Sequence, residues 1–227
     1  MDQIAPHIFS WTAPHPEYRP RAEEVVSYAL LDGGALALVD PLLPADEGRR
    51  AALLAELDEH AGAARRLELL ITIPYHTRSA EEVYERYAKA LPTRLWGHAN
   101  VRRRLKQSTP LKELPRGVAG TCAEVAGGTA LACTIGRPRR SEHPLYFPAL
   151  RAVVFGDAVV GAQGGVRFWN QSEGTDADWY RDAFAPTVAP LVARDVEYVL
   201  VTHGQPVLEG GRRALEECLA APPVDMY

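Results

Sequence analysis

Three side chains that can do chemistry follow apolar segments of the sequence. His76 comes after "LELLIT", Asp157 after "AVVFG" and His203 after "YVLVT". Each apolar segment predicts a buried strand, and the carboxyl ends of strands are where α/β architectures bind ligands. Imidazole and carboxylate groups can ligate zinc or iron, and a histidine can also act as acid or base near neutral pH. One such residue is ordinary, but three in the same context indicate a functional site.

The segment around His76 is predicted to be a loop between a strand and a helix. We predict the strand over 67–72 and a helix from Ser79 to about Ala90. Ser79 and Glu82 match the S-x-x-E capping box, so we expect the Ser79 side chain to cap the helix while Glu82 reaches back to the Ser79 amide. The loop then presents Tyr75, His76 and Arg78 at the strand end.

The rest of the chain alternates short strands with amphipathic helices. Asp32-Gly33-Gly34 joins two strands, 24–31 and 35–40, in a strong hairpin signal. The remaining predicted strands are 6–11, 93–96, 129–135, 145–147, 152–157 and 196–204, and the remaining predicted helices are 45–60, 98–107, 176–193 and 210–221. This order predicts an α/β fold, and nothing in it demands a second domain, so we expect one domain over 1–227.

Composition limits the possible partners and compartments. The 227 residues carry a formal charge of -4, which argues against nucleic acid as the main partner. Cys122, Cys133 and Cys218 lack CxxC spacing, so we expect no disulfide framework, no thiolate zinc site and a reducing, cytoplasmic setting. No apolar run approaches the ~20 residues of a membrane span, and no signal peptide is apparent. The sequence leaves the oligomeric state open.

The order of these segments resembles the metallo-β-lactamase fold superfamily. The segments that carry the resemblance are "LLDGGALALVDP", "TIPYHTRSAEE", "VVFGDAVVG" and "VLVTHGQPVLEGG". The resemblance implies a four-layer αββα sandwich with one or two metal ions, usually zinc and sometimes iron or manganese. It also implies hydrolysis of a small ester, thioester, lactone or phosphoester. Residue by residue, Asp157 matches the family's bridging carboxylate and His203 its last histidine ligand, whereas Asp40 matches a structural acid that supports the ligands without binding the metal.

The metal-binding motif of the family, T-H-x-H-x-D-H, is degenerate here. Placed from Thr72, its ligand positions fall on Ile73, Tyr75, Thr77 and Arg78. A register shifted by one residue gives the second histidine position to His76. The resemblance therefore implies at most one metal ion, held by His76, Asp157 and His203, and possible loss of the metal.

A second departure lies in "IGRPRR", where Arg137 stands in place of a ligand histidine. His143 is close enough in sequence to compensate, and its role stays open. Tyr75 and Trp169 are candidates for the substrate-contacting rim, together with Arg78 and Arg137. The polar insertion 14–24 either covers the mouth of the pocket or is a plain loop.

Three functions remain open. The first is a hydrolase-like enzyme with at most one metal ion. The second is a metal-free pseudoenzyme that binds a small anionic ligand or a partner protein through Arg78 and Arg137, because guanidinium groups repel metal ions. The third is a metal-free acid–base enzyme that uses His76 and the pair of Asp157 and His203. In a site without metal, Asp157 needs a cationic partner, and the sequence predicts Arg78 for that role.

Overall fold

The computed structural model describes residues 1–15, 24–170 and 176–225. The chain divides into two compact units, Met1–Glu113 and Leu114–Tyr227, and each unit is described by itself. Most of the insertion predicted over 14–24 lies outside the described residues. None of the helices in the described part of the chain has the length and apolar character needed to cross a bilayer.

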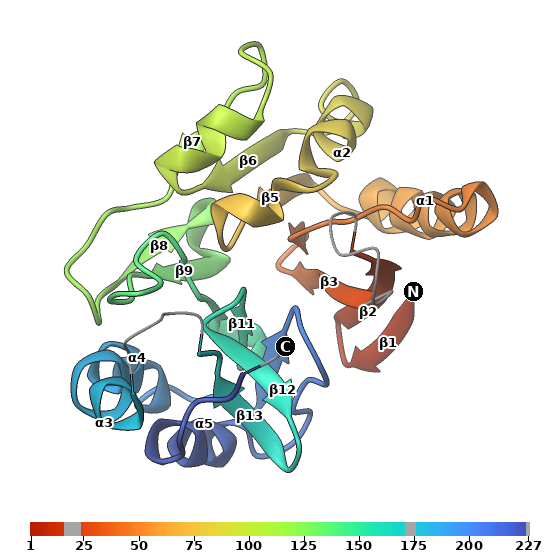
Figure 1. The fold of residues 1–227 in the computed structure, drawn as a ribbon. Coiled ribbons are helices and arrows are strands. Elements are labelled where there is room, and N and C mark those ends of the chain that lie inside the picture. Colours follow the sequence, from red (N-terminus) through yellow and green to blue (C-terminus); the bar gives the residue numbers. More distant parts are fainter. Residues whose placement is uncertain (16–23, 171–175, 226–227) are drawn as a thin grey trace. The chain divides into compact units, whose positions relative to one another are not determined.

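Unit 1 is built on one seven-stranded sheet, counted over its described residues (Figure 1). The strands, in sheet order, are β1 (Asp2–Ala5), β2 (Ile8–Pro14), β3 (Glu24–Asp32), β4 (Ala35–Val39), β5 (Arg66–Leu70), β6 (Thr93–Gly97) and β7 (Lys112–Glu113). The predicted hairpin is confirmed: Gly33 and Gly34 take φ values of +54° and +81° between β3 and β4. β4 to β7 run parallel, so their carboxyl ends meet at one edge of the sheet.

Two helices cover one face of this sheet. They are α1 (Glu47–Ala63) and α2 (Ala80–Tyr87), with the short 3₁₀ segments Pro74–Thr77 and Ala99–Arg104 between later elements. Leu57 of α1 and Val83 of α2 belong to the same buried cluster as Leu38 and Leu69. Leu38 and Leu69 are paired across β4 and β5, so they lie on one face of the sheet and the helices pack on that face.

Unit 2 contains a five-stranded sheet and a separate hairpin among its described residues. The sheet order is β14 (Tyr198–Val201), β11 (Ala152–Phe155), β10 (Leu145–Phe147), β9 (Ala130–Cys133) and β8 (Cys122–Val125); the hairpin joins β12 (Val159–Ala162) to β13 (Gly165–Phe168). β11 and β14 are parallel. Asp157 follows β11 and His203 follows β14, so the two residues lie at the same edge of this sheet.

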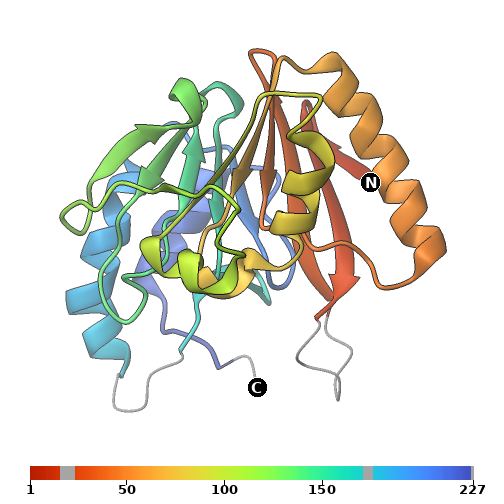
Figure 2. The same ribbon diagram turned by 90° about the horizontal axis from the view of Figure 1, so that it is seen from above.

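Helices cover the five-stranded sheet of unit 2 on one side (Figure 2). They are α3 (Ala177–Trp179), a π-helical turn (Tyr180–Phe184), α4 (Ala185–Val192) and α5 (Gly211–Ala220). Phe155 of β11 and Val201 of β14 are opposite each other, and both pack with Val188 and Leu215 from these helices. Because successive side chains of a strand point to opposite faces of a sheet, the neighbours of Phe155 and Val201 in β11 and β14 point away from the helices.

The predicted capping box is wrong, although the predicted helix start is right. α2 begins at Ala80 with Ser79 as its N-cap residue, but Ser79 makes no side-chain cap hydrogen bond. Its hydroxyl oxygen instead accepts the Leu43 amide at 3.0 Å, and Glu82 forms an ion pair with Arg50 of α1. Tertiary partners thus replaced the local contacts that the four-residue pattern predicted.

The expectation of no disulfide is also wrong. Cys122 and Cys133 are direct partners across β8 and β9 with Cα atoms 4.0 Å apart, and they form a disulfide. The neighbouring Thr134 amide donates to the Thr121 carbonyl, so the cysteines occupy the closely spaced pair that does not exchange backbone hydrogen bonds. Disulfides persist mainly in oxidising compartments, which weakens the argument from the cysteines for a reducing one.

Counting thiols tests this disulfide. Protein unfolded without reductant should show one reactive thiol, Cys218, and reduction should raise the count to three. In the folded state Cys218 should react slowly near neutral pH, because burial raises its pKa to about 12 and leaves little thiolate. A Cys218→Ala variant is the control and should show no thiol before reduction. Three reactive thiols without reductant would contradict the pairing.

Candidate functional site

In unit 1 the chain after β4 and the chain after β5 meet at Asp40 and His76. His76 Nδ1 lies 2.8 Å from Asp40 Oδ2, and both residues are buried. Asp40 also accepts the Thr72 amide at 2.8 Å through Oδ1 and the Thr72 hydroxyl through Oδ2. The carboxylate therefore fixes the His76 ring and uses its Nδ1, so that any ligand role of this histidine falls to Nε2.

Backbone strain accompanies this contact. Asp40 has φ +48° and Arg78 has φ +41°, although neither is glycine. Such conformations are costly for residues with a side chain and occur where the surrounding structure requires them. At Asp40 the left-handed turn follows β4 directly, and it sends the carboxylate toward Thr72 and His76 at the sheet edge.

The other loop residues predicted for unit 1 have separate environments. Arg78 Nη1 donates to the carbonyls of Asp40 at 3.2 Å and Val26 at 3.4 Å. Tyr75 is 67% exposed, and the Arg104 guanidinium lies 4.5 Å from the centre of its ring. The predicted pair of Arg78 with Asp157 joins the two units and stays a prediction, as does a role for Tyr75 in substrate binding.

In unit 2 the structure brings together Asp157 and His203. His203 Nε2 lies 3.4 Å from Asp157 Oδ1, and both residues are buried. The Thr202 hydroxyl donates to the Gly156 carbonyl at 2.7 Å, which ties the end of β14 to the end of β11. The His203 carbonyl accepts the Gly161 amide at 2.8 Å, so the backbone on each side of the histidine is held.

Close backbone packing next to His203 requires glycine. A Cβ built at Gly161 would lie 2.3 Å from the Gln205 amide nitrogen, and one built at Gly204 would lie 2.5 Å from the Gly161 carbonyl oxygen. Gly204 also has φ +78°. The "HG" pair seen in the sequence thus has a steric reason: the loop after β14 runs against β12 with no room for a side chain.

Glu142 positions Asp157, and the sequence analysis did not single it out. Its side chain is fully buried, and its two oxygens accept the amides of Gly156 at 2.9 Å and Asp157 at 3.1 Å. A buried carboxylate with two backbone donors is well satisfied, and it fixes the turn that carries Asp157. The available signal was a single acid in an otherwise basic loop, "GRPRRSEHP".

Arg139 is the second residue that the sequence analysis missed. It is 7% exposed, and its Nη1 lies 3.5 Å from Asp157 Oδ2. Its guanidinium lies 5.2 Å from the centre of the Trp169 ring, and that ring is 5.2 Å from the His203 ring. Arg137, the arginine that the sequence pattern favoured, is exposed. His143 is buried, and its predicted role as an additional ligand stays open.

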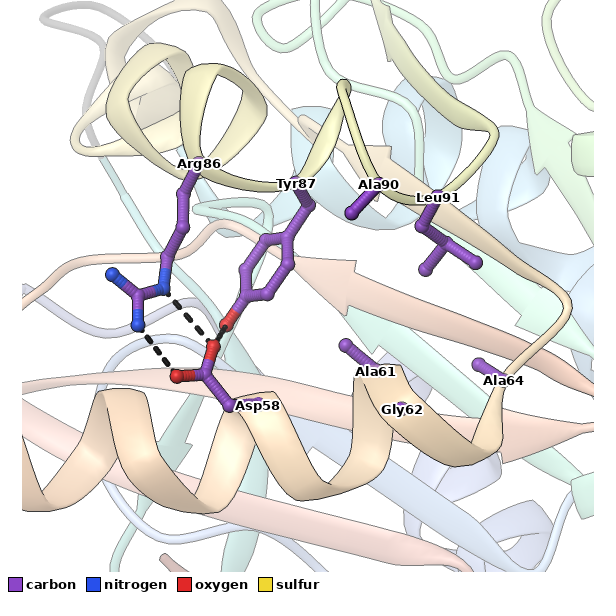
Figure 3. A pocket seen from close by; sticks show the side chains of 8 residues that line it. All are labelled: Asp58, Ala61, Gly62, Ala64, Arg86, Tyr87, Ala90 and Leu91. Carbon is purple, nitrogen blue, oxygen red and sulfur yellow. Dashed lines mark hydrogen bonds and ion pairs between the residues drawn. The ribbon is translucent and has the colours of Figure 1, made fainter.

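A pocket of about 510 Å³ lies elsewhere in unit 1, beside α1 and α2 (Figure 3). Asp58 accepts Arg86 Nε at 3.0 Å, Arg86 Nη2 at 2.5 Å and the Tyr87 hydroxyl at 2.8 Å. Arg86 lowers the pKa of Asp58, whereas burial and then Asp58 raise the pKa of Tyr87 to about 12. The polar groups of this pocket satisfy one another and its other lining residues are small or apolar, so it offers no group for chemistry.

Comparison with known proteins supports the fold. No protein-family model and no curated protein matches the sequence. Among solved structures, a metallo-beta-lactamase from Erythrobacter litoralis has a TM-score of 0.65 at 15% identity, covering 96% of this chain and 93% of that one. FIM-1 from Pseudomonas aeruginosa in its mono-zinc form has a TM-score of 0.62 at 14% identity, covering 96% and 93%. A metallo-beta-lactamase family protein from Thermus thermophilus has a TM-score of 0.59 at 18% identity, covering 96% and 80%.

The chain therefore has the metallo-β-lactamase fold, and the predicted α/β class of this type is confirmed. At identities below 20% the likeness establishes the fold alone. Chemistry has to be argued from the side chains of this chain.

Removing the Glu142 carboxylate tests its positioning role. Glu142→Ala leaves two buried amides without an acceptor and should lower the free energy of unfolding by about 3 kcal/mol. Glu142→Gln keeps one side-chain oxygen, so it should lower the free energy of unfolding by about half as much as Glu142→Ala does. Glu124→Ala is the matched control, since Glu124 is exposed on β8. Chemical denaturation measures all three, and equal stabilities of Glu142→Ala and wild type would refute the role.

Proposed function

We propose that this chain is a hydrolase-like protein that acts on a small ester, thioester, lactone or phosphoester and holds at most one metal ion. One observation carries the proposal. The two oxygens of the Asp157 carboxylate face different partners: Oδ1 lies 3.4 Å from His203 Nε2, and Oδ2 lies 3.5 Å from Arg139 Nη1.

The spacing on the His203 side suits ligation of one ion. A distance of 3.4 Å is longer than a good hydrogen bond between a ring nitrogen and a carboxylate. Two ligand atoms bound to one tetrahedral zinc ion at its usual bond lengths lie about 3.3 Å apart. Catalytic zinc sites use three protein ligands, and the sequence supplies His76 as the proposed third. The contact of its Nδ1 with Asp40 is the kind of support that metal-ligating histidines receive.

The Arg139 side of the carboxylate is unsuited to a second ion. A guanidinium stays charged at all relevant pH values and repels a dication placed on the same oxygen. The proposed site is for that reason mononuclear. A bound metal would lower the pKa of a water molecule and so supply hydroxide near neutral pH. Asp157 and His203 would hold the ion, Asp40 would orient His76, and Arg139 would balance the second oxygen of Asp157.

A metal-free protein that binds a small anion is the second candidate. The buried guanidinium of Arg139 favours it, because this cation already compensates Asp157 without a metal ion. Arg78 and Arg137, which the sequence suggested for this role, are less suited: Arg78 donates to backbone carbonyls of its own unit, and Arg137 is exposed.

Elemental analysis of protein purified without added metal or chelator decides between the two. We expect up to one zinc or iron ion per chain, with at least a tenfold loss of occupancy in Asp157→Asn, His203→Ala and His76→Ala. Hydrolysis of p-nitrophenyl acetate, a thioester, a lactone and bis-p-nitrophenyl phosphate should fall in parallel. His7→Asn, a change at an exposed histidine, is the control. Two ions per chain would contradict the mononuclear site, and no metal with no hydrolysis would favour the binding protein.

A further inference from the structure

We infer that Arg139 is an anion-recognition residue, and that the ligand of this site carries a carboxylate or phosphate group that binds the guanidinium beside Asp157. This deepens the proposed function by naming the substrate class, and its test is separable from a test for hydrolysis. The observation behind it is a buried guanidinium with unused hydrogen-bond donors.

The two unused donors are Nε and Nη2. Both are buried, and neither has a hydrogen-bond acceptor among the described residues. The guanidinium contacts Asp157 through the ion pair at Nη1, and it lies against the Trp169 ring. Glu142, the other buried acid near Asp157, gives its oxygens to backbone amides instead. Burying a charged donor without an acceptor is costly, so this arrangement calls for an acceptor that the described residues do not supply.

The edge formed by Nε and Nη2 is the one that binds carboxylates side-on. Arg86 shows this in the same chain: its Nε and Nη2 donate to the two oxygens of Asp58 at 3.0 and 2.5 Å (Figure 3). Arg139 presents the same pair of donors with no carboxylate on them. A carboxylate or phosphate has two oxygens at the right spacing to fill this edge.

Arg139 is held in place by its own loop. Its amide donates to the Gly136 carbonyl at 3.0 Å, and its carbonyl accepts the Glu142 amide at 2.7 Å. The Gly136 amide in turn donates to the Thr187 hydroxyl of α4 at 3.0 Å. The Trp169 ring covers the guanidinium and also contacts His203. The loop thus holds the guanidinium in place, and because Nε and Nη2 are buried, an anion reaches them only when a covering side chain moves aside.

Anion titration of the purified full-length chain tests this inference. Isothermal titration calorimetry with inorganic phosphate and, separately, with succinate should detect binding at low ionic strength, and the tighter of the two probes identifies the group. Arg139→Gln should weaken binding at least tenfold. Arg139→Lys keeps the charge but lacks the two-donor edge, and we expect an intermediate loss. Arg137→Gln, on the same loop with an exposed side chain, should bind as wild type does.

Stability measurements separate recognition from a structural role. Arg139→Gln leaves the buried carboxylate of Asp157 without its guanidinium partner and should lower the free energy of unfolding, so its affinity is compared with that of wild type only under conditions where circular dichroism shows the variant folded. If Arg139→Gln does not fold, the anion affinity of Arg139→Lys is compared with that of wild type instead. Equal affinities would overturn the inference. It is also overturned if wild type binds neither anion, or if Arg139→Gln binds with unchanged affinity.

The outcomes for the two proposals are distinct. Anion binding that depends on Arg139, in a protein without metal or hydrolysis, would leave this inference standing and remove the proposed hydrolase. Hydrolysis of neutral esters by a protein that binds neither anion would support the proposed hydrolase and overturn this inference.

Discussion

The sharing of one carboxylate between an imidazole and a guanidinium is the constraint on which the rest of unit 2 depends. Asp157 is buried, and a buried charge must be compensated from nearby. Arg139 compensates the charge at one oxygen, and the His203 ring lies 3.4 Å from the other. Both residues therefore have to be brought to the end of β11 from distant parts of the chain.

Buried hydrogen bonds of the surrounding loops and strands hold Asp157 and its neighbours in these positions. Glu142 fixes the turn after β11 through two backbone amides, and Thr202 ties that turn to the end of β14. In unit 1 the same principle operates at Asp40, where a left-handed residue after β4 directs a carboxylate to His76. In each unit a buried acid positions a side chain that follows a strand: Asp40 orients His76 in unit 1, and Glu142 positions Asp157 in unit 2. In unit 1 the backbone conformation at Asp40 is strained.

Features that depend on local pattern could be predicted from the sequence. The Asp32-Gly33-Gly34 turn, the strands that lead to Asp157 and His203, and the start of α2 all follow from periodicity and turn chemistry. The rest depends on which residues meet in space. The pattern "GRPRR" does not tell which arginine turns inward, and it favoured Arg137 over Arg139. Cys122 and Cys133 are placed symmetrically about a turn at 126–128, but that signal has meaning only once β8 and β9 are recognised as partners.

The position of Trp169 gives this site an optical property. The centre of its indole ring lies 5.2 Å from the guanidinium carbon of Arg139 and 5.2 Å from the centre of the His203 ring. The emission of an indole responds to charges at such distances. An oxyanion bound at Arg139 would therefore alter the fluorescence of a tryptophan that is part of the structure. Ligand binding at the site should therefore change the part of the intrinsic fluorescence that comes from Trp169, one of the four tryptophans of the chain, without a label and before any substrate has been identified.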